Sequence, residues 1–203
     1  MSVRPELKLT YGEYLDFPRD GNRYEILDGE LVVRPSAGRR HHRLVLRLSA
    51  LVERFVARYA LGQVFRGPLD VMLSETDVVQ PDLLYLSKKR ARRLTEACVQ
   101  GAPDLIVEVS TPESRVSDRT QKREAYERFD LWEYWRFDLE WEAVEVYRRD
   151  VKHSLTFRSR LEKSAGGVLT SPLLAGVEIS LPALFALADR TPTRPEHLPV
   201  STQ

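Results

Sequence analysis

Residues 101–109 read Gly-Ala-Pro-Asp-Leu-Ile-Val-Glu-Val, and they contain the most apolar strand that the sequence predicts. Gly101 and Pro103 interrupt any preceding element, while the aliphatic and β-branched run from Leu105 to Val109 is typical of a strand. Glu108 lies inside this run. The apolar neighbours make exposure on both faces improbable, so the segment indicates a strand covered by other elements. A carboxylate in such a strand is costly to bury without a partner.

A second acid has similar surroundings. Residues 78–86 read Val-Val-Gln-Pro-Asp-Leu-Leu-Tyr-Leu, which places Asp82 at the start of another apolar strand. We expect the strands of Asp82 and Glu108 to pair. Two costly carboxylates on paired strands indicate a site that holds a cation, with Lys122 downstream as a candidate third member.

The surrounding segments alternate between strand and helix patterns. Apolar residues from Leu44 to Tyr59 follow i, i+3, i+4, i+7 spacing, which predicts a helix over 41–59. Two apolar runs around Asp28-Gly29 predict a β-hairpin. Further helices are expected over 10–17, 88–97, 118–129 and from Pro182 onward, and further strands over 62–66, 69–73, 83–86, 105–109, 132–137, 143–147 and 154–158.

This order predicts an α/β (α+β) fold with a central mixed β-sheet flanked by helices. No change of composition marks a second domain, so we expect a single domain over residues 1–190. The Pro-rich segment 191–203 is expected to be a flexible tail.

The composition restricts the class of protein. Charged residues make up 30% of the chain, yet the net charge is only +1, which argues against a protein coated in basic surface but leaves room for a local basic groove. The one cysteine, Cys98, excludes an internal disulfide and a cysteine-based zinc site, and it suits a reducing compartment. No apolar run is long enough to span a bilayer, and the N-terminus lacks a signal-peptide core. We therefore expect a cytoplasmic protein with no membrane partner.

The acids suit phosphodiester hydrolysis. That reaction requires offsetting the phosphate charge, deprotonating a water and stabilising the leaving oxygen, and Mg²⁺ or Mn²⁺ serves all three needs. These cations prefer oxygen ligands, commonly one or two carboxylates. Asp82 and Glu108 are of the right type and number, and a nearby lysine can orient the water or stabilise developing charge.

Several ordered motifs resemble a known family. They are Tyr24-Glu-Ile-Leu-Asp-Gly-Glu-Leu-Val-Val, Pro68-Leu-Asp-Val-Met-Leu, Val79-Gln-Pro-Asp-Leu-Leu-Tyr, the 101–109 strand, 118–126, Glu133-Tyr-Trp and Ser171-Pro-Leu-Leu-Ala-Gly-Val-Glu-Ile. In this order they are similar to the Uma-type family of restriction endonucleases, catalogued as a domain of unknown function within the PD-(D/E)xK nuclease superfamily. The resemblance spans residues 10–187.

The resemblance implies a restriction-endonuclease-like core and a metal-dependent endonuclease that hydrolyses DNA. It implies that Asp82 and Glu108 are the metal-binding acids, with Mg²⁺ or Mn²⁺ as cofactor, and that Glu25 is an additional ligand or positions the water. The superfamily places a lysine two residues after the second acid, where this chain has Ser110. Lys122 is the expected substitute. In a helix it shares one face with Asp118 and Tyr126.

Each candidate also has an ordinary structural interpretation. Asp82 could cap local backbone after Pro81. Glu108 could be an edge-strand residue paired with an arginine, Lys122 could be a solvated lysine paired with Asp118, and Glu25 could be an ordinary hairpin residue.

Three other groups of residues also have two interpretations. His41 and His42 either contact phosphate or water, or simply open the main helix. The basic run 88–93 either follows a phosphate backbone or is a solvated face, and Trp132, Tyr134 and Trp135 either stack on bases or pack in the core.

Because Ser110 replaces the motif lysine, a non-catalytic nucleic-acid-binding or regulatory module on the same fold is the alternative function. Nuclease action on RNA is a third hypothesis. The expected substrate is double-stranded DNA. Cleavage of both strands generally calls for two sites, so a homodimer is expected.

Overall fold

A central six-stranded sheet carries most of the architecture. The computed structural model describes residues 8–18, 20–34, 36–110, 120–150 and 154–189. The sheet order is β11-β10-β9-β8-β6-β3. Its strands are β3 (Gly62–Arg66), β6 (Leu83–Ser87), β8 (Leu105–Ser110), β9 (Glu133–Asp138), β10 (Ala143–Arg149) and β11 (Leu155–Glu162). Only β8 and β9 are parallel, so the sheet is mixed as predicted. Parallel neighbours need a crossover, and helix α4 (Gln121–Arg128) lies between them in sequence.

A second sheet has five strands in the order β2-β1-β5-β4-β7. They are β1 (Arg23–Leu27), β2 (Glu30–Arg34), β4 (Val71–Ser74), β5 (Asp77–Val79) and β7 (Val99–Gln100). The predicted hairpin joins β1 to β2, with Leu27 paired to Glu30. Asp28 and Gly29 in its turn have φ of 53° and 81°, the left-handed values that two-residue hairpin turns require. The sequence predicts a single sheet, and the second sheet emerges only in the folded chain.

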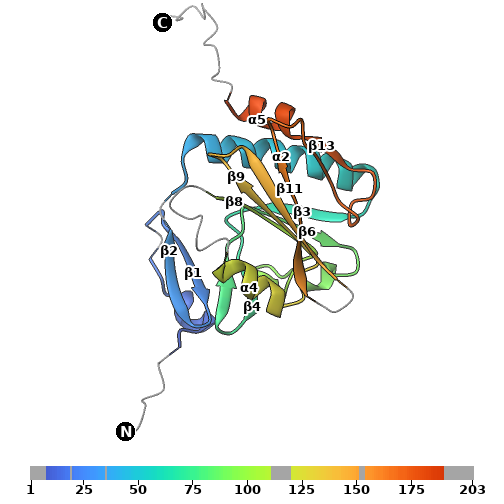
Figure 1. Cartoon of the computed structure of the whole chain (residues 1–203). Helices are drawn as coiled ribbons and strands as arrows, with labels where there is room; N and C mark the ends of the chain where they lie inside the picture. Colours follow the sequence, from blue (N-terminus) through green and yellow to red (C-terminus); the bar gives the residue numbers. More distant parts are fainter. Residues whose placement is uncertain (1–7, 19, 35, 111–119, 151–153, 190–203) are drawn as a thin grey trace, which may run out of the picture.

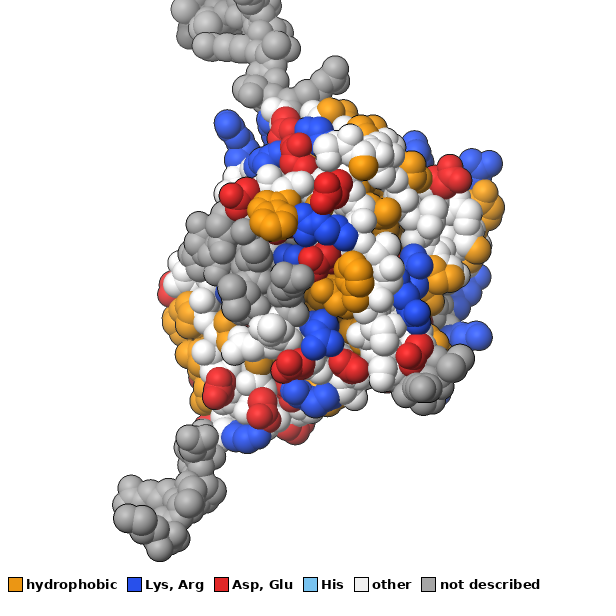
Figure 2. All heavy atoms as spheres, in the orientation of Figure 1, with side chains coloured by type: hydrophobic (Ala, Val, Ile, Leu, Met, Phe, Trp, Pro, Cys, Tyr) orange, Lys and Arg blue, Asp and Glu red, His pale blue; other side chains and the backbone are white. Residues whose placement is uncertain are grey.

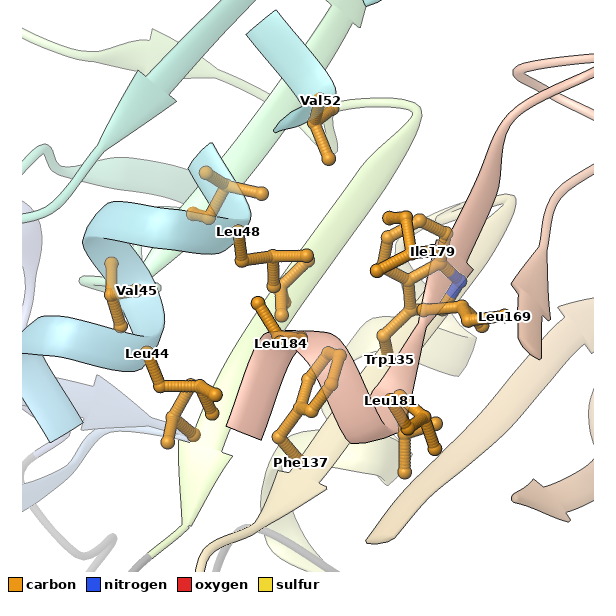
Figure 3. Packing of buried hydrophobic residues seen from close by; sticks show 14 of the residues in the cluster. Leu44, Val45, Leu48, Val52, Trp135, Phe137, Leu169, Ile179, Leu181 and Leu184 are labelled. Atoms are coloured by element: carbon orange, nitrogen blue, oxygen red, sulfur yellow. The ribbon is translucent and has the colours of Figure 1, made fainter. Parts of the chain in front are cut away.

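One face of the six-stranded sheet is covered by α2 (Arg39–Arg58) and α5 (Leu181–Asp189), as Figure 1 shows. The apolar stripe predicted for the long helix is buried: Leu44, Leu48 and Val52 have no exposed surface. These side chains meet Trp135 and Phe137 of β9 and Leu184 of α5 (Figure 3). A two-stranded ribbon, β12 (Val168–Thr170) and β13 (Glu178–Ser180), adds Leu169 and Ile179 to the same core.

The opposite face of the sheet packs against α4 and the second sheet. This core contains Ile106 of β8, Tyr126 of α4 and Val71 of β4, together with other buried apolar residues. Thr10 caps helix α1 (Tyr11–Tyr14), as predicted, but the helix ends at Tyr14 and not at the predicted Phe17. Tyr14 lies in a smaller cluster with Ile26 and Val78. The face of the central sheet that α4 covers is therefore enclosed by protein and not exposed to solvent.

The predicted fold class is confirmed, but one predicted helix is absent and a strand occurs where none was predicted. Segment 88–97 is not a helix and contains only a 3-10 turn at Ala91–Arg93. Arg90 just before this turn is buried and donates to the carbonyl oxygens of Ala102 and Pro103, which fixes the segment as an irregular loop. Strand β5 (Asp77–Val79), which lies between the predicted strands 69–73 and 83–86, was not predicted. The tail predicted over 191–203 and residue Asp118 lie outside the described residues.

Acidic and basic side chains are interspersed over the face of the molecule drawn in Figure 2, with no large area of one sign. This mixed surface agrees with the net charge of +1. In the described part of the chain, no helix is both long and apolar enough to cross a bilayer.

Candidate active site

The register of the central sheet brings the two predicted acids together. Strands β6 and β8 are antiparallel, with Leu83 opposite Val107. One further step along this register sets Asp82 opposite Glu108. The backbone N–H of Val109 donates to Asp82 Oδ2 at 2.8 Å, which fixes the Asp82 carboxylate against the Glu108 strand. The expectation that the two strands pair is confirmed.

Asp82 is held by two further side chains from distant parts of the chain. Arg23 in β1 donates from its guanidinium to Asp82 Oδ1 at 2.7 Å, and His41 Nε2 in the first turn of α2 lies 2.9 Å from Asp82 Oδ2. Asp82 is only 3% exposed. These contacts provide the partners that a buried carboxylate needs.

Burial alone would raise the pKa of Asp82, because it penalises the charged form. The hydrogen bond and charge of His41, the charge of Arg23 and the Val109 N–H act in the opposite direction and outweigh burial. The pKa of Asp82 is therefore well below its ordinary value. Asp82 is ionised at neutral pH, as a cation-binding carboxylate must be.

Glu108 is contacted by two residues of one helix. Lys122 Nζ and Tyr126 Oη each lie 2.8 Å from Glu108 Oε1. Since side chains alternate along β8, Glu108 points away from Val107 and Val109 and toward α4. Lys122 and Tyr126 are i, i+4 neighbours on α4 and face the strand together. The predicted approach of Lys122 from the following helix is confirmed.

Glu25 joins the cluster through Lys122. Lys122 Nζ lies 2.8 Å from Glu25 Oε1 as well as from Glu108, so one ammonium group bridges two carboxylates. Arg34 Nε on the neighbouring strand β2 is 2.9 Å from Glu25 Oε2, and the N–H of Gln80 donates to Oε1. Burial would raise the pKa of Glu25, but the charges of Lys122 and Arg34 dominate and lower it.

The cluster therefore contains three carboxylates and three permanent cations. Glu25, Asp82 and Glu108 are each at most 3% exposed. Their partners Arg34, Arg23 and Lys122 balance the charge without any added ion. A divalent cation in this cluster would thus require a compensating negative charge, which a substrate phosphate carries.

The donor chemistry fits a hard divalent cation. Two carboxylates at opposed positions of neighbouring strands are an appropriate set for Mg²⁺ or Mn²⁺, which commonly bind one or two carboxylates and keep several waters. Among the described residues, no three His, Cys, Asp or Glu side chains are grouped so that they could hold a metal. Glu25 is therefore not placed as a third ligand of Asp82 and Glu108 in this structure.

The ordinary interpretations of these residues are contradicted by burial and position. Lys122 is 1% exposed, so it is not a solvated helix lysine. Glu108 lies in an interior strand of its sheet, so it is not an edge residue. Asp82 binds side chains 59 and 41 residues away rather than only local backbone. Glu25 is fully buried, unlike an exposed hairpin glutamate.

The two groups considered as nucleic-acid contacts each divide into buried and exposed members. Tyr134 and Trp135 have no exposed surface and pack in the two cores, whereas Trp132 is 43% exposed. In the basic run, Arg90 is buried while Lys88 and Lys89 are exposed.

Arg23 and Arg34 were not predicted as site residues, whereas His41 was considered as a contact to phosphate or water. His41 also lies on the buried stripe of its helix, three residues before Leu44. Arg23 and Arg34 are ordinary strand arginines in the sequence, and only the folded chain brings them to the acids.

Comparison with known proteins defines the family. A model of the Uma2 family, described as "Putative restriction endonuclease", matches residues 11–182. The chain belongs to the Uma2 family. All four predicted site residues of this Uma2 protein, Glu25, Asp82, Glu108 and Lys122, lie within the matched segment.

Solved structures add a comparison of the fold. A "putative nuclease belonging to DUF820" from Anabaena variabilis has a TM-score of 0.74 at 17% identity, covering 89% of the Uma2 chain and 99% of its own. The type IIG restriction endonuclease BpuSI has a TM-score of 0.36 at 13% identity, covering 71% of the Uma2 chain and 15% of its own. No curated protein sequence matches the chain. The first structure shows that the fold is that of a protein described as a nuclease.

Proposed function

We propose that this Uma2 protein is a divalent-metal-dependent endonuclease that hydrolyses phosphodiester bonds of DNA. One observation carries the proposal: Asp82, Glu108 and Lys122 come from three separate elements and meet in one buried cluster. Buried charge of this kind is expensive unless it is paired, and it is a physical marker of functional sites. The family assignment supports the same chemistry.

Each residue has a defined part in the proposed chemistry. Asp82 and Glu108 would hold Mg²⁺ or Mn²⁺. A cation bound there supplies Lewis acidity and lowers the pKa of a bound water. The Lys122 ammonium, 2.8 Å from Glu108, is available to orient the attacking water or to stabilise charge on the phosphate. Glu25 and Tyr126 fix Lys122 and Glu108 in place by hydrogen bonds.

Lys122 takes the part of the lysine expected at position 110. Ser110 is 1% exposed, and Arg136 donates to its hydroxyl at 3.5 Å. A lysine at position 110 would have to share this enclosed space with the Arg136 cation. Lys122 instead supplies the ammonium from α4 and reaches Glu108 without needing the space at position 110.

The test is nicking of supercoiled DNA by the purified full chain with Mn²⁺, Mg²⁺ or EDTA. We expect cleavage with either metal and none in EDTA. Asp82→Asn and Glu108→Gln should each reduce cleavage by at least about 100-fold while keeping the circular dichroism of the parent. Retained cleavage in both variants would overturn the assignment.

Glu133→Gln is the matched control. Glu133 is as buried as the site acids, but it binds Trp135, Arg148 and Ser171 on the α2 side of the sheet. Its substitution disturbs a buried acid without touching the proposed metal ligands. We expect its cleavage rate per folded molecule to equal that of the parent.

The second candidate function is a nucleic-acid-binding module without turnover. The pairing of Asp82 with Arg23 and His41 favours it, because that carboxylate is satisfied without a metal. Calorimetry with Mn²⁺ at millimolar concentration separates the two functions. Absence of metal binding together with retained DNA binding would favour the non-catalytic function.

A further inference from the structure

A pocket of about 680 Å³ opens beside Asp82. It is bounded by the segment that follows α1, by β1, by the start of α2 and by the loops before β4 and β6. Three of its lining residues, Arg23, His41 and Asp82, belong to the candidate active site. Its size is within the range of small-molecule sites, and it far exceeds the space that one phosphate group needs.

Part of the lining is aromatic. Phe17 and Tyr24 have ring centroids 5.4 Å apart and are only partly buried, so they present ring surface to the pocket. Tyr14 continues this group, with its ring 5.7 Å from that of Phe17. Aromatic side chains beside an active site are suited to stacking against a planar ring.

The pocket also contains a carboxylate, that of Asp70, which can accept a further hydrogen bond. Asp70 Oδ1 accepts hydrogen bonds from Tyr14 Oη at 2.7 Å and from Gln80 Nε2 at 2.8 Å. Asp70 Oδ2 accepts none from the described residues. The two bonds at Oδ1 fix the carboxylate, so Oδ2 has a set position from which it can accept a hydrogen bond.

A second polar atom lacks a partner. His41 Nδ1 is buried and makes no hydrogen bond within the described part of the chain. Buried polar atoms are nearly always satisfied, so this one is an exception in the wall of the pocket. His41 Nε2 is engaged with Asp82, which fixes the orientation of the ring.

We propose that this pocket binds one unstacked nucleobase of the DNA substrate, beside the phosphate at the Asp82 cluster. The inference rests on the proposed function. A base offers a planar face to Phe17 and Tyr24 and ring or amino N–H donors to Asp70. In a duplex, stacking covers the planar face of a base and pairing engages its N–H donors. The pocket therefore selects a nucleotide that is flipped out or unpaired. The substrate class is therefore DNA in which one base is displaced from the stack, either by flipping out of a duplex or because it is unpaired.

The experiment measures binding in EDTA, where turnover is absent. Three fluorescent duplexes are compared by anisotropy: one fully paired, one with a single unpaired nucleotide, and one with an abasic nucleotide at that position. We expect the unpaired base to bind at least about fivefold more tightly than the abasic probe, as expected when one base stacks on aromatic side chains. Equal affinity for the base and abasic probes would overturn the proposal.

Variants of pocket residues test whether the pocket causes the difference in affinity between the unpaired-base and abasic probes. Phe17→Ala should abolish the preference for the base, and Asp70→Asn, which keeps the shape of the side chain, should reduce it. Tyr59→Ala is the control: Tyr59 is an exposed aromatic just past the other end of α2, about 27 Å from His41 at 1.5 Å per residue. A preference that persists in both pocket variants would place the base elsewhere and refute the inference.

A parallel cleavage assay with Mn²⁺ separates this inference from the proposed function. Base-dependent binding without cleavage of any probe would support the pocket and refute the nuclease. Cleavage of the fully paired and unpaired probes at equal rates, with equal binding of the base and abasic probes, would support the nuclease and refute the pocket.

Discussion

Lys122 Nζ lies 2.8 Å from Glu108 Oε1, although the two residues belong to a helix and a strand separated by 14 positions in sequence. The same nitrogen lies 2.8 Å from Glu25 Oε1. One ammonium group thus connects the second sheet, through Glu25, to the central sheet, through Glu108. The contact has consequences both for the proposed chemistry and for the stability of the fold.

Substitution of Lys122 should therefore destabilise the protein strongly. Lys122→Met leaves Glu25 and Glu108 without their shared cation, and removal of one partner of a buried ion pair costs about 3–5 kcal/mol. The free energy of unfolding in urea measures this. Arg123→Met is the control, because Arg123 forms partly exposed pairs with Glu124 and Glu127, each worth less than about 1 kcal/mol. A loss for Lys122→Met as small as that of the control would contradict the bridging geometry.

Arg23 should compete with a divalent cation for Asp82. Its guanidinium is 2.7 Å from Asp82 Oδ1, and its side chain is 23% exposed, so it can leave this position. Arg23→Ala removes a positive charge beside the proposed metal ligand and should tighten Mn²⁺ binding about fivefold, equivalent to about 1 kcal/mol. Calorimetry without nucleic acid measures the affinity. Arg47→Ala, at an exposed arginine of α2, should leave it unchanged. Weaker or unaltered Mn²⁺ binding in Arg23→Ala would speak against Asp82 as a ligand.

The stability that Glu25 provides should depend on pH. Its pKa in the folded protein is lowered, since burial, which raises it, is outweighed by Lys122 and Arg34. The contribution is therefore complete above the unfolded-state pKa of about 4.3, and it is lost as the pH falls from there toward the folded-state value. Glu25→Gln should be less stable than the parent at pH 7, and this difference should narrow as the pH falls below about 4.

Urea unfolding of metal-free protein at pH 7, 5, 4 and 3 measures this difference. Glu53→Gln, at an exposed residue of α2, should differ little from the parent at every pH. If the gap between parent and Glu25→Gln were the same at pH 7 and pH 3, Glu25 would not be ionised in the way that its contacts require.

The elements predicted correctly are those whose signal is local. The α2 stripe follows from the 3.6-residue period, and the β1–β2 hairpin follows from Asp28-Gly29 at its turn. The acids were also predictable, because Asp82 and Glu108 stand out chemically in apolar strands. Lys122 was predictable from the helical spacing that aligns it with Tyr126. In each case a few neighbouring residues carry the information.

What could not be predicted depends on contacts between distant residues. Arg23 and Asp82 are separated by 59 positions, and no spacing rule relates them. The second sheet depends on β4 pairing with both β5 and β7, and β7 has only two residues, too short for any periodic signal. The basic run 88–93 has helix-forming side chains, but hydrogen bonds from Arg90 to distant carbonyls override that propensity.

Arg90 should consequently contribute to stability far more than its neighbours in the same run. It donates to Ala102 O, Pro103 O and Asp130 O, and hydrogen bonds from a charged group are worth about 1.5–3 kcal/mol each. We expect Arg90→Ala to reduce the free energy of unfolding by about 3 kcal/mol. Arg92→Ala, at an exposed position two residues on, should change it by less than about 0.5 kcal/mol.

Urea unfolding measures both changes. Equal small effects would mean that Arg90 behaves as a solvated residue, and the whole run would then be available to follow a phosphate backbone. A large effect confined to Arg90 leaves the exposed members of the run, the lysines Lys88 and Lys89 and the arginine Arg92, available to contact nucleic acid. Substituting these two lysines should then reduce the salt dependence of DNA binding without changing the free energy of unfolding.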